Sequence, residues 1–150
     1  MLALLKDRVT GRIVVNAVLL DSMNKAVTRM NDLSALKEVA PGISSMQCAF
    51  SRLRLPLTRA VVVDAHGKYE DVAMSEMLDE VERGRIPFML TTPNFDIKAL
   101  TKMMIGRDIG CTIILCEELG HPTETISFGN AEHPPIASSR LLSLILADAR

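Results

Sequence analysis

Tryptophan is absent from this 150-residue chain, and aromatic residues make up only 3% of it. Hydrophobic residues nevertheless account for 48% of the sequence, so the core must be built from aliphatic side chains. A composition this apolar excludes a disordered chain. Proteins that bind single-stranded nucleic acid stack the bases on aromatic side chains, and the shortage of aromatics argues against that class.

The chain also lacks a marked excess of either charge, because its formal net charge is −1. Dedicated nucleic-acid-binding domains are usually strongly basic. No apolar run reaches the roughly 18 residues of a membrane span. The start of the chain has neither the basic lead nor the cleavage site of a signal peptide. The cysteines Cys48, Cys111 and Cys116 lie among apolar residues, which predicts reduced thiols and an intracellular protein.

Short motifs that identify common enzyme sites are missing as well. The sequence contains no P-loop, no G-x-G-x-x-G, no C-x-x-C, no H-E-x-x-H and no G-x-S-x-G. None of the common sequence motifs for binding a nucleotide cofactor is therefore present, and we expect the protein to bind no cofactor.

Apolar runs alternate with amphipathic segments along the chain. Strands are expected over residues 12–20, 45–50, 60–65, 86–91, 111–116 and 124–128. Helices are expected over residues 21–39, 69–83, 94–105 and 140–149, with an edge segment or loop over 51–59. The expected fold class is α/β, a three-layer sandwich with a mainly parallel sheet of about four to five strands and helices on both faces.

Two parts of the chain are predicted from this pattern. Residues 1–129 form the α/β core domain, and residues 130–150 form a linker with a C-terminal helix or mobile tail. The segment Asn130 to Pro135 is polar and rich in proline, which is typical of a linker. The last segment, "RLLSLILADA", is apolar nearly all round, so a helix there must dock on another surface.

Polar side chains follow several expected strands, where ligands of α/β sheets usually bind. Asp64, His66, Glu117, Glu118 and His121 could hold a divalent cation through carboxylate and imidazole ligands. They could equally be loop residues and helix caps. The corner Thr91-Thr92-Pro93-Asn94 has no glycine and no reactive side chain, and we interpret it as a bend at which Asn94 caps the next helix.

Basic residues gather in two places. Arg52, Arg54 and Arg59 form one group, and Lys98 and Lys102 lie along an expected helix. Either group could contact RNA phosphates or an acidic protein surface, although charge on a solvent-exposed face is the simpler interpretation.

The layout of four segments resembles a known family. The segments "IVVNAVLLDS", "AVVVDA", "RIPFMLTTP" and "KMMI" are spaced, over residues 12–116, as in the small assembly and packaging factor of cystovirus procapsids. The resemblance implies a non-enzymatic protein of the virion inner capsid that helps to assemble the shell and package RNA. It implies the capsid protein, the viral polymerase and the packaging motor as partners, and a mobile tail from about Asn130.

Three hypotheses of function follow from these observations. The first is a non-enzymatic interaction protein, a viral assembly and RNA-packaging accessory factor. The second is a small metal- or nucleotide-binding α/β enzyme domain that uses the loops at the carboxyl ends of the strands. The third is a dimerisation module that pairs through the last helix to form a homodimer.

Overall fold

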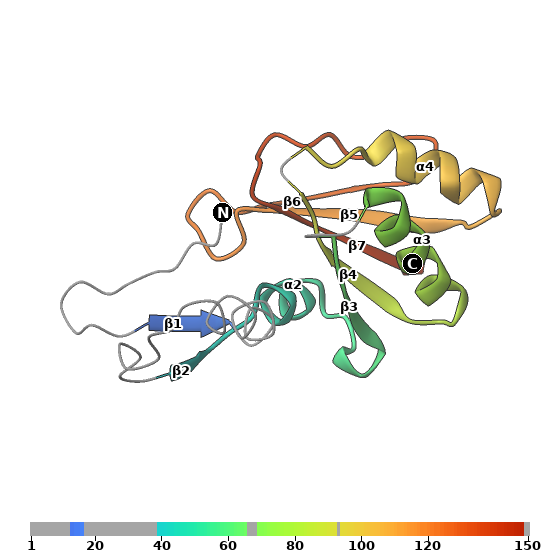
Figure 1. Ribbon diagram of the computed structural model, residues 1–150. Coiled ribbons are helices and arrows are strands. Elements are labelled where there is room, and N and C mark those ends of the chain that lie inside the picture. The colour runs from blue at the N-terminus through green and yellow to red at the C-terminus, as the bar shows by residue number, and fades with distance from the viewer. Residues whose placement is uncertain (1–12, 17–38, 66–68, 93, 149–150) are drawn as a thin grey trace. The chain divides into compact units, whose positions relative to one another are not determined.

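The computed structural model of the protein describes residues 13–16, 39–65, 69–92 and 94–148 (Figure 1). The chain divides into two compact units, residues 1–48 and residues 49–150. In the first unit, β1 (Ile13–Asn16) pairs in parallel with β2 (Val39–Gly42). A strand at the position of β1 was predicted. The body of the helix predicted over residues 21–39 lies outside the described residues.

The second unit is built on one five-stranded sheet in the order β3-β4-β7-β5-β6. The described elements from residue 45 onward are α2 (Ser45–Leu53), the 3-10 helix η2 (Leu57–Arg59), β3 (Ala60–Asp64), α3 (Glu70–Glu82), β4 (Ile86–Leu90), α4 (Ile97–Gly106), β5 (Cys111–Glu117), β6 (Thr125–Gly129) and β7 (Leu142–Asp148). The α/β class is thereby confirmed.

The sheet is mostly antiparallel, so the expectation of a mainly parallel sheet is wrong. Only β3 and β4 pair in parallel, whereas β7 is antiparallel to both of its neighbours and β6 is antiparallel to β5. Because β7 separates β4 from β5, those two strands still run in the same direction as β3. The carboxyl ends of β3, β4 and β5 therefore meet at one edge of the sheet, which we call the carboxyl-end edge.

The C-terminal segment is a central strand of this sheet and not the predicted helix or tail. β7 pairs with β4 on one side and with β5 on the other. A strand that is covered on both faces is apolar at nearly every position, and such a run cannot be distinguished from a buried helix by periodicity. Leu144, Ile145 and Leu146 are all fully buried, as this account requires.

Residues 45–53 form α2, although a strand was predicted over residues 45–50. The helix begins with a capping box, in which the Ser44 amide donates to Gln47 Oε1 at 2.9 Å and the Gln47 amide donates to Ser44 Oγ at 3.0 Å. Ala49 and Phe50 are fully buried on the inner side of the helix. The sequence therefore carried a helix-start signal that the apolar pattern concealed.

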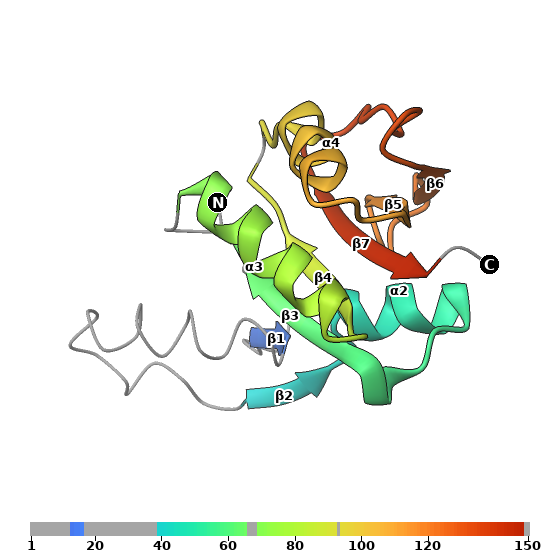
Figure 2. The same cartoon turned by 90° about the vertical axis from the view of Figure 1, so that its right-hand side faces the viewer.

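Helices α3 and α4 cover one face of the sheet, and the end of α2 lies on the other face (Figures 1 and 2). Register places Met89, Leu144 and Leu115 side by side on the first face. They pack in one core with residues of α3 and α4, among them Met77, Leu78, Leu100 and Met104. On the opposite face, register aligns Phe88, Ile145, Ile114 and Phe128 in a row that ends at the edge strand β6.

The N-cap of α4 (Ile97–Gly106) lies two residues later than predicted. Asp96, and not Asn94, is the N-cap, and its Oδ1 accepts hydrogen bonds from the amides of Lys98 and Ala99 at 2.9 and 3.1 Å. None of the helices in the described part of the chain is long and apolar enough to span a membrane.

Candidate functional site

The carboxyl-end edge is lined by polar residues that follow β4. Thr91 is buried, and its hydroxyl donates to the carbonyl oxygen of Leu142 at 2.8 Å. The Thr92 hydroxyl donates to Oε1 of Glu70 in the first turn of α3. The corner that was interpreted as a bend thus ties β4 to β7 and to α3, while Pro93 within it lies outside the described residues.

Glu117 ends β5 at the same edge and is the most enclosed carboxylate there, with an exposed fraction of 3%. Its Oε1 accepts hydrogen bonds from the amides of Ser138 and Ser139 at 2.7 and 2.5 Å and from the Ser138 hydroxyl at 3.1 Å. Its Oε2 accepts from Thr125 Oγ1 at 3.3 Å. Glu117 therefore anchors the β6–β7 connection to the end of β5.

The pKa of Glu117 reflects these contacts. Burial by itself raises the pKa, but the hydrogen bonds from Ser139, Ser138 and Thr125 outweigh it, so the pKa lies below its ordinary value. At neutral pH the side chain is a carboxylate held for structure. Ser138 and Ser139, which directly precede the segment predicted as a C-terminal helix, are the hydrogen-bond donors to Glu117.

The predicted metal ligands do not form one cluster. Asp64 ends β3 and Glu117 ends β5, and β4 and β7 lie between these strands. Three strand spacings separate the two carboxylates by about 14 Å, too far for both to bind one cation. Within the described ranges, no three His, Cys, Asp or Glu side chains form a group that could hold a metal ion.

The remaining predicted ligands are placed as follows. Glu118 has a positive φ of 52° and accepts a hydrogen bond from the Ser139 hydroxyl. His121 is exposed in the turn before β6, and its backbone amide donates to the Glu118 carbonyl oxygen at 2.9 Å. His66 lies outside the described residues. A metal bound by Glu118 or His121 remains a prediction.

The cysteines of β5 do not provide a nucleophile. Cys111 and Cys116 are both buried, and they lie on opposite faces of the strand. Burial raises the pKa of the Cys111 thiol to about 11, and the nearby charge of Asp148 adds to the rise. Cys111 is therefore protonated at neutral pH and packs as a small apolar residue of the core.

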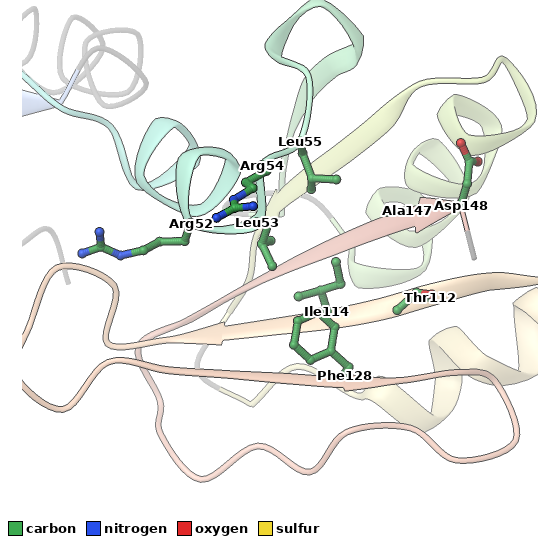
Figure 3. A pocket seen from close by; sticks show the side chains of 9 residues that line it. All are labelled: Arg52, Leu53, Arg54, Leu55, Thr112, Ile114, Phe128, Ala147 and Asp148. Atoms are coloured by element: carbon green, nitrogen blue, oxygen red, sulfur yellow. The ribbon is translucent and has the colours of Figure 1, made fainter. Parts of the chain in front are cut away.

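A second feature lies on the face of the sheet that α3 and α4 leave uncovered. We call it the arginine groove, and it is lined by Arg52, Leu53, Arg54, Leu55, Thr112, Ile114, Phe128, Ala147 and Asp148 (Figure 3). Its cavity has a volume of about 410 Å³. Figure 3 shows Leu53, the last residue of α2, and Leu55, which follows the helix, above Ile114 of β5 and Phe128 of β6.

The predicted basic residues fall on both faces of the sheet. Arg52 pairs with Glu124 at 3.0 Å, and Arg59 pairs with Asp148 at 2.7 Å. The Gly120 amide and the Arg52 guanidinium lower the pKa of Glu124. Lys98 and Lys102 are exposed on α4, across the sheet from the arginine groove. The two groups therefore do not form one continuous basic surface, and RNA or protein binding by either group stays a prediction.

Another cavity, of about 630 Å³, lies between the end of α4 and the β6–β7 connection. It is lined by Met104, Ile105, Asp108, Ile109, Gly110, Cys111, Thr112, Gly129, Asn130, Ala131 and Glu132. Two carboxylates line the cavity, Asp108 and Glu132, and both are exposed, whereas the third titratable residue, Cys111, is buried. It offers no converging set of polar groups such as specific ligand sites contain.

Comparison with known proteins identifies the family. The family model of tetrapyrrole (corrin/porphyrin) methylases matches residues 19–135. No curated protein sequence shows a significant match to the chain.

Solved structures of similar fold include a methylase, a methyltransferase and a protein described as a diphthine synthase. The cobalamin biosynthesis precorrin-6Y methylase of Archaeoglobus fulgidus gives a TM-score of 0.51 at 26% identity, over 75% of this chain and 49% of its own. The methyltransferase CobJ gives a TM-score of 0.56 at 14% identity, and the match covers 89% of this chain and 59% of CobJ. A protein from Entamoeba histolytica that is described as a diphthine synthase gives a TM-score of 0.57 at 11% identity. That match covers 88% of this chain and 62% of the other protein. The chain thus spans about half to three fifths of each of these structures.

These matches overturn the resemblance to a cystovirus packaging factor. The family model matches residues 19–135, which include most of residues 12–116 on which that resemblance was based, and it describes methylases. The inferences that depended on the resemblance fall with it: a viral protein, procapsid assembly, RNA packaging, a place in the virion inner capsid and the absence of enzymatic activity. The alternative of a small α/β enzyme domain agrees better with the findings. The spacing of apolar runs misled because many α/β domains share it.

Proposed function

This chain belongs to the tetrapyrrole (corrin/porphyrin) methylase family, and from that premise we propose that it transfers a methyl group to a corrin-type tetrapyrrole. The observation that carries the proposal is the family match over residues 19–135. The precorrin-6Y methylase narrows the expected substrate class to a corrin precursor, since it is 26% identical to this chain.

Methyl transfer is chiefly a matter of positioning. A nucleophilic carbon or nitrogen of the macrocycle attacks the methyl carbon, and the donor leaves with the electrons of the broken bond. The acceptor loses a proton when the attacking atom carried one. Holding two reactants in line removes most of the entropic cost of their encounter. The residues of this chain would therefore act by binding and orienting, and no covalent intermediate with a side chain is needed.

The carboxyl-end edge is the part of the described chain that suits such binding. In open α/β sheets, ligands bind beyond the carboxyl ends of the strands. Asp64 and Glu70 bring carboxylates to this edge, and the Thr92 hydroxyl lies against Glu70. A sulfonium methyl donor such as S-adenosylmethionine is a cation at sulfur, so the sign of charge at this edge fits it. When bound, the donor would supply an electrophilic methyl group.

The size of the cavities limits what the described part does alone. The two cavities measure about 410 and 630 Å³. Both volumes lie within the roughly 300–1,000 Å³ of pockets that hold a single ligand. We therefore assign to the carboxyl-end edge one side of the binding site, with Thr92 and Glu70 as orienting residues.

The test is transfer of a labelled methyl group from S-adenosylmethionine to precorrin-6Y, followed by the mass of the product. We expect a product heavier by one methyl substitution and a rate at least about tenfold lower in Thr92→Val and Glu70→Gln. Thr92→Val removes the hydrogen bond between these two side chains, and Glu70→Gln removes the negative charge of its acceptor. Glu132→Gln, at an exposed position on the β6–β7 connection, is the matched control and should keep the wild-type rate. The proposal fails if the wild-type protein neither transfers the label nor binds S-adenosylmethionine in calorimetry.

A further inference from the structure

The arginine groove has the composition of a small-molecule site that methyl transfer does not require. Its floor is apolar, with Ile114 buried, Ala147 nearly buried and Phe128 exposing 61% of its surface. An exposed aromatic ring beside two leucines leaves apolar area in water that a ligand could cover. The cavity of about 410 Å³ lies within the range of single-ligand pockets.

Charge around the arginine groove leaves one cation unbalanced. Arg52 is paired with Glu124 at 3.0 Å, and Asp148 is paired with Arg59 at 2.7 Å. The guanidinium of Arg54 has no ion-pair partner among the residues that the structure describes. The groove therefore presents one positive charge, which complements a ligand with one negative charge.

Arg54 occupies a backbone position that disfavours its side chain. It has a φ of 54° and follows the last residue of α2 in the left-handed conformation. Its amide donates to the carbonyl oxygen of Ser51, and the Leu55 amide donates to the carbonyl oxygen of Phe50. These two backbone hydrogen bonds define a Schellman motif, in which the residue with the left-handed conformation is usually glycine. α3 ends in the same motif with Gly84, at a φ of 74°. α4 ends in it with Asp108, at a φ of 55°.

An arginine at that position costs stability, and within the described ranges its side chain makes no hydrogen bond or ion pair that would offset the cost. A non-glycine residue in the left-handed region is disfavoured relative to glycine. Aspartate tolerates the region because its short side chain bonds locally, whereas arginine has no such advantage. Strain of this kind at a cavity points to a ligand that uses the side chain.

We propose that the arginine groove binds a small apolar carboxylate, with its hydrocarbon part on Ile114 and Phe128 and its carboxylate on the guanidinium of Arg54. Arginine binds carboxylates through two parallel N–H donors, and the apolar part would cover the exposed phenylalanine ring. The groove lies apart from the carboxyl-end edge: Thr112 precedes Glu117 by five positions on β5, or about 17 Å of extended strand. The proposal is therefore independent of the proposed methyl transfer.

The test uses the absence of tryptophan from the chain. Phe128→Trp places one fluorescent reporter on the floor of the groove, and its emission is followed during titration with octanoate or with 1-octanol. We expect octanoate to bind at least about tenfold more tightly than the uncharged alcohol, as a charged hydrogen bond predicts. Adding Arg54→Gly should abolish that preference while raising the melting temperature by about 2–4 °C. Arg54→Lys should keep most of the preference.

Asp108→Gly in the same reporter background is the matched control, because it relieves the same backbone position at the end of α4, away from the groove. It should leave the preference for octanoate unchanged. Equal binding of octanoate and 1-octanol to the reporter protein would overturn the proposal, as would a preference that survives Arg54→Gly. A melting temperature lowered by Arg54→Gly would overturn the argument from strain. A protein that is dimeric, that becomes monomeric on Arg54→Glu and that ignores octanoate would show that a second copy occupies the groove.

Discussion

Removing the Glu117 side chain should loosen the whole β6–β7 connection. In Glu117→Ala, the amides of Ser138 and Ser139 lose the acceptor that holds them at 2.7 and 2.5 Å. Each unsatisfied amide costs about 1–3 kcal/mol when it is fully buried, and less where water can replace the acceptor. Ser138 is exposed and Ser139 is half-buried, so we take the lower part of that range. The free energy of unfolding should fall by about 2–3 kcal/mol.

The assay is thermal unfolding followed by far-UV circular dichroism. A loss of this size corresponds to a melting temperature about 5–10 °C lower. Glu132→Ala, at an exposed position on the same connection, should leave the melting temperature within about 1 °C, since surface substitutions away from special contacts are nearly neutral. A drop in Glu117→Ala no larger than in the control would refute the reasoning that this carboxylate anchors the connection.

The pH dependence gives an independent check with Glu117→Gln. The folded pKa of Glu117 is lowered, so its stabilising effect is present above the ordinary value of 4.5 and is lost as the pH falls through the lower folded value. The melting temperatures of the wild type and Glu117→Gln should therefore differ at pH 7 and converge below pH 4.5. A constant difference down to that range would show that the charge of Glu117 contributes nothing.

Three further substitutions test the fold. Gly129→Ala would place a Cβ 2.4 Å from the His133 carbonyl oxygen and 2.7 Å from the ring of Pro135, so it should lower the free energy of unfolding by about 1–3 kcal/mol in urea titration. Asp96→Ala removes the N-cap of α4 and should cost about 1 kcal/mol in the same titration, whereas Asp96→Asn should retain most of the stability. Leu144→Ala opens a cavity at a fully buried position of β7 and should cost about 2–5 kcal/mol; an unchanged urea midpoint would contradict the central place of β7.

The elements with a strong local pattern of apolar residues, such as α3 and β3, could be predicted from the sequence alone. α3 was expected over residues 69–83 and occurs as Glu70–Glu82, since apolar residues recur there at helical spacing. The strand expected over residues 60–65 occurs as Ala60–Asp64. An apolar run bounded by turn residues defines a strand whether or not its partners are known.

The candidate site could be predicted only in part. Alternation of strands and helices predicted that polar residues such as Asp64 and Glu117 follow strands, and these two residues do end β3 and β5. It could not show that β7 returns between β4 and β5 and moves Asp64 away from Glu117. The left-handed position of Arg54 was equally hidden, because nothing at that residue marks a helix end as glycine does at Gly84.

The sequence by itself determined the aliphatic core, the α/β class and the elements with strong local periodicity, because these depend on the residues within each segment. Only the tertiary structure decided that residues 142–148 form a central antiparallel strand, because a run of apolar residues is compatible with a helix or a strand until its neighbours are known. The tertiary structure also decided that Glu117 is held for structure and that Arg54 has no ion-pair partner among the described residues. Those properties arise from contacts between segments that are distant in the chain, such as Arg59 with Asp148 and Glu117 with Ser138.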